Sequence, residues 1–302
     1  MKGINFEEFV DVKSFDKLSE LYPVLCEERL SAKETGVGYR TLNHWDEMKI
    51  IRFTRTSDIG NRKFNFVDFI WIKIVNELRS FGLNLNTIKQ IANGVYESIP
   101  MQVILEQLAI NIDKLQDFEA EDKEEFINFL KSGEYKNADF SEMPFQFNLL
   151  HILITEAIAT RQSVAIIVFN NGEWLPFFKD NEHLYPEELL YKINYHSQIR
   201  VNITDLIFKF IVEDYLNEYL TELKVFTKQE EELLGYVLKG DYKKVFVLFK
   251  SKKNEPVEIP KSIQAQEAIV RILREKEYRE FILTDKKGKE FRIRAKANEE
   301  LN

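Results

Sequence analysis

The spacing of apolar residues along the chain predicts mostly helices, interrupted by short strands. Apolar side chains recur every three or four positions over residues 5–22, which predicts one or two short helices ending at Pro23. The pattern then predicts a short helix over residues 30–35, a left-handed turn at Gly36 and a second helix over 39–48. Two helices joined by so tight a turn form a helix-turn-helix unit.

Two short apolar runs follow, at residues 50–53 and 62–66, on either side of a polar tip. We expect them to form a β-hairpin wing. A strongly apolar helix is predicted over 67–81 and ends at Gly82, and Asn84 is predicted to cap a further short helix. Together these elements predict a winged helix-turn-helix.

The rest of the chain is less uniform. Residues 98–118 carry a narrow apolar stripe, typical of a helix that pairs with another helix, and residues 119–146 are acidic and predicted as a linker or short helices. The turn Asn170-Asn171-Gly172 predicts a hairpin between residues 164–169 and 173–178. A long helix is expected over 203–223. From residue 244 a strand, a helix over 263–276 and a final hairpin predict a small α+β module, and no internal repeat is evident.

These elements predict a mainly α fold with small β elements, of the α+β class. A chain of 302 residues is long enough for several domains with buried cores. We therefore divide it into a helical extension (1–26), a winged helix-turn-helix domain (27–94), a dimerisation or coupling helix (95–118), an acidic, mainly helical sensing or interaction domain (119–240) and a basic α+β module (241–302).

The net charge of −8 conceals a strong asymmetry along the chain. Residues 27–94 hold 11 basic and 8 acidic side chains, and residues 239–302 hold 17 and 11, whereas residues 95–238 hold 11 and 26. Because ions screen charges beyond a Debye length of about 10 Å, a local basic surface can bind nucleic acid on an acidic protein.

Several classes of function lack their sequence signatures. The longest apolar runs are far too short to cross a bilayer, so we expect a cytoplasmic protein without membrane contact. A single cysteine, Cys26, and four scattered histidines are poor material for a metal site. We find no glycine-rich phosphate loop, no nucleophile elbow and no zinc-protease motif, and therefore expect neither catalysis nor a cofactor.

One stretch carries a specific ordered pattern. It runs through Thr35-Gly36-Val37, Arg40-Thr41-Leu42, Trp45-Asp46-Glu47, Gly60-Asn61-Arg62 and Leu78-Arg79 before Gly82. This order and spacing resemble the DNA-binding domain of the MerR family of bacterial transcription regulators. The resemblance covers about a fifth of the chain, and it implies a winged helix-turn-helix that binds double-stranded DNA.

The second helix of such a unit fits the major groove. Tyr39, Arg40 and Asn43 are placed at its start, where Arg can bind guanine, Asn can pair with adenine and the Tyr hydroxyl can reach a phosphate. Further contacts to phosphate are predicted for the wing and its surroundings. The candidate DNA-binding residues are Tyr39, Arg40, Asn43, His44, Arg52, Arg55, Arg62 and Lys63.

The sequence departs from the family pattern at four positions. Asn43 and His44 stand where the family usually has Arg and Tyr, Lys49 replaces a usual glycine, and Asn61 replaces an aromatic residue. None of these changes affects an apolar position, so they alter the expected contacts rather than the expected fold.

In MerR relatives the helix that follows the DNA-binding domain pairs with its mate, which implies a homodimer. The candidate dimerisation residues here are Ile104, Leu108, Ile112 and Leu115. A two-fold dimer would match two half-sites of a pseudo-palindrome. The usual metal-binding place after this helix has no cysteine, so a metal-sensing role is not expected.

A cluster of aromatic residues follows in the middle of the chain, and clusters of this kind form either core or ligand pockets. Trp174, Phe177 and Tyr191 are the candidate effector-binding residues. The basic C-terminal hairpin either adds nonspecific DNA contacts or is simply solvated. Two other functions stay open: an architectural or excision factor that bends DNA, and a protein-interaction module that docks a partner through the winged helix.

Overall fold

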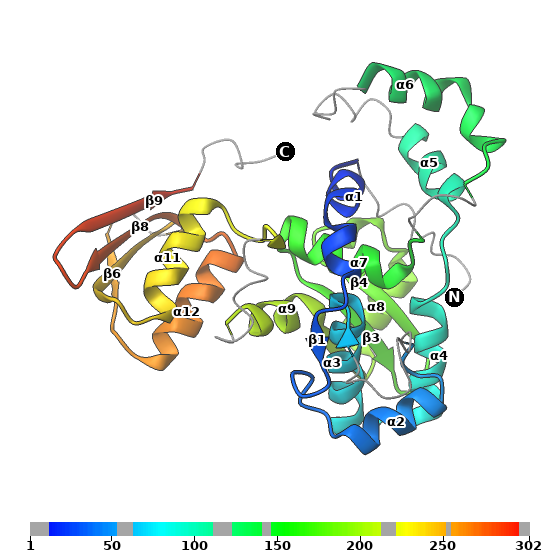
Figure 1. Cartoon of the computed structure of the whole chain (residues 1–302), viewed down its shortest axis with the longest axis horizontal. Helices are drawn as coiled ribbons and strands as arrows, with labels where there is room; N and C mark the ends of the chain where they lie inside the picture. The colour runs from blue at the N-terminus through cyan, green and yellow to red at the C-terminus, as the bar shows by residue number, and fades with distance from the viewer. Residues whose placement is uncertain are drawn as a thin grey trace. The chain divides into compact units, whose positions relative to one another are not determined.

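The computed structural model describes residues 12–52, 63–110, 123–140, 146–212, 222–251 and 255–295 (Figure 1). It contains two compact units, unit 1 at Met1–Leu206 and unit 2 at Ile207–Asn302. Helices dominate, and all strand pairs among the described residues are antiparallel, so the predicted α+β class is confirmed. Unit 1 includes segments that the sequence pattern assigned to four separate domains.

The helix-turn-helix begins differently from the prediction. Leu30–Ser31 is a short strand, β1, and the chain then makes tight turns instead of the predicted helix over 30–35. The amide of Glu34 donates to Ser31 O at 3.1 Å, and the amide of Gly36 donates to Lys33 O at 3.2 Å. Gly36 has a φ of +71°, as its predicted left-handed position requires. Helix α2 (Tyr39–Glu47) follows, as predicted.

The predicted wing hairpin is wrong for the part of it that the structure describes. The returning strand β2 (Lys63–Phe64) pairs with β1, with Ser31 opposite Lys63, and Ile50 and Ile51 lie in no strand. The indole nitrogen of Trp71 donates to Ile50 O at 2.7 Å in the core, which ties this segment to the helix behind it. Residues 53–62, which hold the predicted tip (54–61) and one end residue of each predicted strand, lie outside the described residues.

Two helices complete the predicted winged helix-turn-helix domain (27–94), which we call the head. Asparagine caps and a glycine stop lie at their ends. Helix α3 (Phe66–Ser80) begins at Asn65, whose Oδ1 accepts from the amide of Asp68 at 2.7 Å. Helix α4 (Leu85–Val95) begins at Asn84, whose Oδ1 accepts from the amide of Thr87 at 2.9 Å. Between them Gly82 adopts a φ of +85°. The predicted stop and the predicted cap are both confirmed.

Unit 1 wraps further elements around this head. Helix α3 contacts α1, α4, α7 and β5, and α1 packs on α7, so segments from both flanks of the head share its core (Figure 1). The elements are α1 (Val12–Cys26), α5 (Met101–Ile110), α6 (Lys123–Ser132), η3 (Glu134–Lys136), α7 (Leu149–Thr160), η4 (Glu182–Leu184) and α8 (Glu187–Tyr195). Helix α9 (Ile203–Val212) begins in unit 1 and ends in unit 2.

A three-stranded sheet lies within unit 1, in the order β4-β3-β5. The predicted hairpin is confirmed: β3 (Val164–Phe169) pairs with β4 (Trp174–Phe178), and Gly172 in the turn has a φ of +84°. The third strand, β5 (Gln198–Asn202), was not predicted, because Val201 is its single fully buried residue and no alternation marks it.

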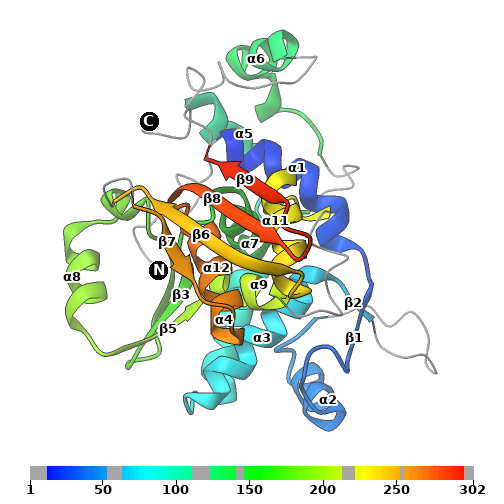
Figure 2. The same ribbon diagram turned by 90° about the vertical axis from the view of Figure 1, so that its left-hand side faces the viewer.

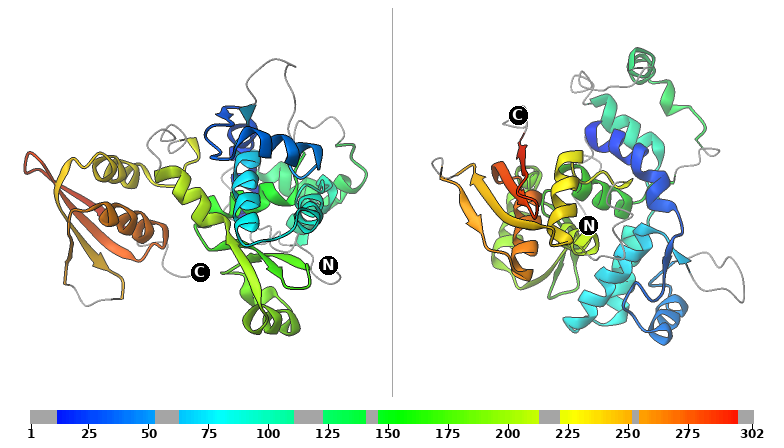
Figure 3. Two further views of the ribbon diagram at one scale, coloured as in Figure 1. Left: turned by 90° about the horizontal axis from the view of Figure 1, so that it is seen from below. Right: turned by 60° about the vertical axis from the view of Figure 1, so that its left-hand side comes forward.

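Unit 2 has two layers, with α11 (Lys228–Leu238) and α12 (Ile263–Arg274) on one face of a four-stranded sheet (Figures 2 and 3). The strands are β6 (Tyr242–Phe249), β7 (Val257–Ile259), β8 (Tyr278–Asp285) and β9 (Glu290–Arg294), in the order β7-β6-β8-β9. The predicted final hairpin and the helix before it are confirmed.

Unit 2 consists of two αββ halves, which corrects the expectation that the chain has no internal repeat. Each half starts with a hydroxyl N-cap, Thr227 or Ser262, and each inner strand starts at a buried tyrosine, Tyr242 or Tyr278. In the sheet Phe246 lies opposite Ile282, its counterpart in the other half. A pseudo-two-fold axis therefore passes between β6 and β8.

Candidate nucleic-acid interface

Helix α2 presents a polar face to solvent. Leu42 and Trp45 are buried and anchor the helix, whereas Tyr39 is 58% exposed and Arg40 and His44 are also exposed. The helix starts at Gly38, which offers no side-chain cap. A helix N-terminus carries a partial positive charge, so this end of α2 attracts anions such as phosphate.

The C-terminal end of α2 is closed by a Schellman motif. The amide of Lys49 donates to Asp46 O at 2.8 Å, and the amide of Ile50 donates to Trp45 O at 2.9 Å. This motif needs a left-handed residue after the helix, and Lys49 supplies it with a φ of +57°. The geometry explains why the family usually has glycine at this position, and it fixes the direction in which the chain leaves α2.

Asn43 lies differently from its predicted neighbours. Its side chain is half-buried, and its Oδ1 is buried without a hydrogen-bond partner among the described residues. Bidentate pairing with adenine needs both the oxygen and the nitrogen of the amide. The structure therefore brings Tyr39, Arg40 and His44 to one exposed face and does not bring the Asn43 oxygen there.

Arg52 is exposed, and its side chain contacts Asn93 of α4 and Tyr96, the residue after α4. Its guanidinium lies 5.1 Å from the centre of the Tyr96 ring, and one of its nitrogens donates to Asn93 Oδ1 at 3.4 Å. The Tyr96 hydroxyl donates in turn to Asp68 Oδ1 at 2.9 Å. Burial is the main cause that raises the pKa of the Asp68 carboxyl to about 7; the Tyr96 hydrogen bond lowers it, and Glu28 raises it further.

The other basic candidates are only partly described. Lys63 is exposed on β2, next to β1, whereas Arg55 and Arg62 lie outside the described residues. Two further cations of the head, Lys33 and Lys49, are also exposed. The described head therefore places several positive charges around α2.

Residues 31–95 match the sequence model of the MerR HTH family of regulatory proteins. This segment is a MerR-type helix-turn-helix domain. The matched family is one of regulatory DNA-binding proteins, and the match spans about a fifth of the chain. No curated protein and no solved structure is significantly similar to the chain.

The predicted dimerisation stripe follows the MerR-type domain on α5. Ile104 and Leu108 are each 1% exposed, because they are buried within the chain itself, where α5 contacts α6 and η3. Ile110 is 70% exposed on the same helix. Ile112 and Leu115 lie outside the described residues, and dimerisation through this segment stays a prediction.

The three aromatic residues predicted to bind an effector are not gathered around one space. Phe177 is buried, stacked on Tyr185 with ring centres 5.6 Å apart, and Trp174 is largely buried. Tyr191 is 59% exposed on α8, beside Tyr195. Trp174 instead contacts the MerR-type domain: a Cβ on Gly94 of α4 would lie 2.4 Å from its ring.

Cys26 has one histidine beside it. Its Sγ lies 3.6 Å from Nε2 of His151, whose Nδ1 lies 2.8 Å from Asn148 Oδ1. Burial raises the pKa of the Cys26 thiol and lowers that of His151 to about 4, so both groups are neutral at pH 7. Among the described residues no three His, Cys, Asp or Glu side chains gather as metal ligands, and no helix there is long and apolar enough to cross a membrane.

Proposed function

We propose that the protein is a transcription regulator that binds specific double-stranded DNA as a homodimer in the cytoplasm. The observation that carries this proposal is the exposed start of α2, with Tyr39 and Arg40, inside a segment that matches the MerR family. A helix with a polar exposed face and a buried apolar face is the element that such domains insert into the major groove.

The exposed side chains divide into two roles. Arg40 is assigned to a guanine edge, because a guanidinium can bind O6 and N7 together, and the buried Oδ1 of Asn43 makes that residue the weaker candidate. Tyr39, His44, Arg52 and Lys63 are assigned to phosphates, with Arg55 and Arg62 as further candidates. Phosphate contacts fix position, and base contacts supply sequence preference.

Dimerisation is the second part of the proposal. Two copies of a head that reads a short half-site gain affinity when both bind one DNA molecule. Because Ile104 and Leu108 are already buried within the chain, an interface through α5 would use its exposed side, where Ile110 lies. In this proposal a small-molecule effector or a protein partner binds unit 1 outside the MerR-type domain and changes the affinity for DNA.

Selection of binding sites from random duplexes with the full-length protein tests the proposal. We expect enrichment of one motif, arranged as two inverted half-sites. Arg40→Ala is expected to weaken binding to that site by about tenfold to a hundredfold, because one base contact is worth about 1–3 kcal/mol. Lys131→Ala, which removes an exposed cation from α6, is the matched control and is expected to bind as the wild type does.

Salt dependence separates the remaining possibilities. DNA binding requires a steep fall in affinity with rising salt, since each neutralised phosphate releases counterions. If no motif is enriched and the affinity for DNA does not change with salt, DNA recognition is refuted. That result would favour docking of a protein partner through α2. A motif without inverted half-sites would refute the dimer alone.

A further inference from the structure

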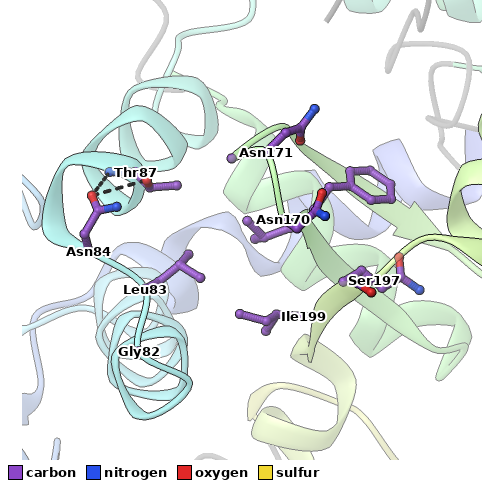
Figure 4. A pocket seen from close by; sticks show the side chains of 12 residues that line it. Gly82, Leu83, Asn84, Thr87, Asn170, Asn171, Ser197 and Ile199 are labelled. Atoms are coloured by element: carbon purple, nitrogen blue, oxygen red, sulfur yellow. Dashed lines mark hydrogen bonds between the residues drawn. The ribbon is translucent and has the colours of Figure 1, made fainter.

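A cavity of about 520 Å³ lies between two turns of unit 1 (Figure 4). One wall is the α3–α4 turn of the MerR-type domain, and the other walls are the β3–β4 turn and the start of β5. We propose that this cavity binds a neutral, hydroxyl-rich small molecule of sugar or nucleoside size. Its volume falls in the range of about 300–1,000 Å³ that is usual for small-molecule sites.

Backbone hydrogen bonds close the turns that form the first two walls. In the α3–α4 turn the amide of Leu83 donates to Leu78 O at 3.1 Å, which closes the end of α3. In the β3–β4 turn the amides of Phe169 and Gly172 bond to Glu173 O and Phe169 O at 2.8 and 3.0 Å. A preformed site loses little conformational entropy when a ligand binds.

The two turns are also held against each other. A Cβ placed on Gly172 would lie 3.7 Å from the Thr87 methyl group, so the hairpin turn passes close to α4. On the same hairpin Trp174 packs on Gly94, further along the same helix. The separation of the walls is therefore set by packing.

The polar groups that line the cavity are amides and hydroxyls. Oδ1 of Asn84 is occupied by Thr87, and Oδ1 of Asn171 accepts from the amide of Glu173 at 3.0 Å. Their amino groups have no hydrogen-bond partner among the described residues and are left to donate. Gln198 also lines the cavity, but its Nε2 donates to Ile193 O at 2.8 Å and its Oε1 is buried, so the Gln198 oxygen is not offered to a ligand.

This lining selects a class of ligand. None of the residues that the structure places around the cavity is Asp, Glu, Lys, Arg or His, so a charged group would lose hydration without an ionic partner. The two amino groups of Asn84 and Asn171 can donate to the hydroxyl groups of a polyol, which accept as well as donate. Leu83, Val168 and Ile199 offer apolar surface for its carbon face.

The proposal does not rest on DNA binding, and its test contains no DNA. Thermal unfolding of the full-length protein would be followed with millimolar glucose, maltose, adenosine or uridine, and with their phosphorylated counterparts glucose 6-phosphate, AMP and UMP. We expect at least one neutral probe to raise the Tm by about 2 °C or more, and its phosphorylated counterpart to have a much smaller effect.

Two isosteric variants assign the binding to this cavity. Asn84→Asp and Asn171→Asp keep the oxygen that holds the turn but replace the donor with an anion, and aspartate caps a helix as well as asparagine does. Each is expected to weaken the active probe at least about tenfold, while the fold is retained. Asn86→Asp adds the same charge at an exposed position of α4 that does not line the cavity, and it should bind as the wild type does.

The binding measurements on these variants either support or overturn the proposed cavity site. Selective loss in the two cavity variants, with the control intact, supports the site. The proposal is overturned if none of the four neutral probes shifts the Tm. It is also overturned if the phosphorylated counterparts bind equally well, or if Asn84→Asp retains wild-type affinity.

Discussion

The two units achieve stability in different ways. In unit 1 the MerR-type domain is packed between helices that lie far apart in the sequence, since α1 precedes it and α7 follows it. The amide of Ile99, just after the domain, donates to Phe147 O at 2.9 Å and ties the chain there to the segment before α7. In unit 2 each αββ half is continuous in sequence, and the halves meet along β6 and β8. The stability of the MerR-type domain thus depends on contacts with segments far away in the sequence. Each half of the repeat in unit 2 is instead formed by residues that are close in the sequence.

Two helical glycines, one in each unit, test this difference between the units. Their replacement by alanine is expected to give the largest change in the free energy of unfolding. Gly94→Ala in unit 1 should lower the free energy of unfolding by about 2 kcal/mol, because the new methyl group would overlap the Trp174 ring. Gly235→Ala in α11 of unit 2 meets nothing within 4 Å and should raise it by about 0.5–1 kcal/mol, since alanine favours helices.

All three tryptophans, Trp45, Trp71 and Trp174, lie in unit 1, so tryptophan fluorescence in urea follows unit 1 selectively. Hydrogen exchange of the α11 amides follows unit 2. Equal effects of the two substitutions would show that the Trp174 contact does not constrain unit 1.

A pH titration of unit 1 should show the next largest effect. The pKa of Asp68 is raised from about 4 to about 7 in the fold, so the folded protein binds more protons than the unfolded chain between these values. The contribution of Asp68 to stability is therefore fully present below pH about 4, and about 1–3 kcal/mol of it is lost between pH 5 and 8 as the pH rises through 7. Asp68→Asn should remove this dependence in urea unfolding measured between pH 5 and 8, and an unchanged slope would contradict the assignment to Asp68.

The repeat in unit 2 predicts matched effects at its two N-caps. Thr227→Ala and Ser262→Ala should each cost about 1 kcal/mol, because each side chain accepts the hydrogen bond of an amide in the first helical turn. Swapping the two residue types, Thr227→Ser with Ser262→Thr, is the near-neutral control. Hydrogen exchange of each helix gives the measurement, and a large effect at one cap with none at the other would break the equivalence of the halves.

The smallest effect is expected where both units use a left-handed lysine after a helix. Lys49 has a φ of +57° after α2, and Lys276 has a φ of +48° after α12. Replacement of either by glycine should raise the free energy of unfolding by about 0.5 kcal/mol, since glycine adopts this conformation without strain but loses more chain entropy on folding. Calorimetry would detect the shift, and a loss of stability would show that lysine is unstrained there.

The sequence predicted unit 1 best where short-range signals act alone. The asparagine caps at Asn65 and Asn84 and the stop at Gly82 depend on neighbouring residues, and Asn84 and Gly82 were both identified. The prediction of the wing hairpin is wrong because β2 pairs with β1, some thirty residues away, rather than with the neighbouring segment that includes Ile50 and Ile51. The pairing partner of a strand this short is decided by tertiary packing, which periodicity does not report.

The repeat and the cavity escaped prediction for related reasons. The two halves of unit 2 differ by one residue in the length of the helix, since α11 has 11 residues and α12 has 12. The cavity gathers residues from three segments that lie far apart in the chain, around Asn84, Asn171 and Gln198. On α2, by contrast, the ordered motif placed Tyr39 and Arg40 correctly on an exposed face, because helical geometry alone determines it.

The symmetry of unit 2 has a consequence for its ancestry. A polypeptide with only one αββ half would leave the long edge of its inner strand unsatisfied, and such an edge recruits another strand. A second identical copy offers a matching edge, and the offset at which Phe246 meets Ile282 is the one that a true dyad would impose. Gene duplication and fusion of a small homodimer would produce the tandem arrangement seen in this chain.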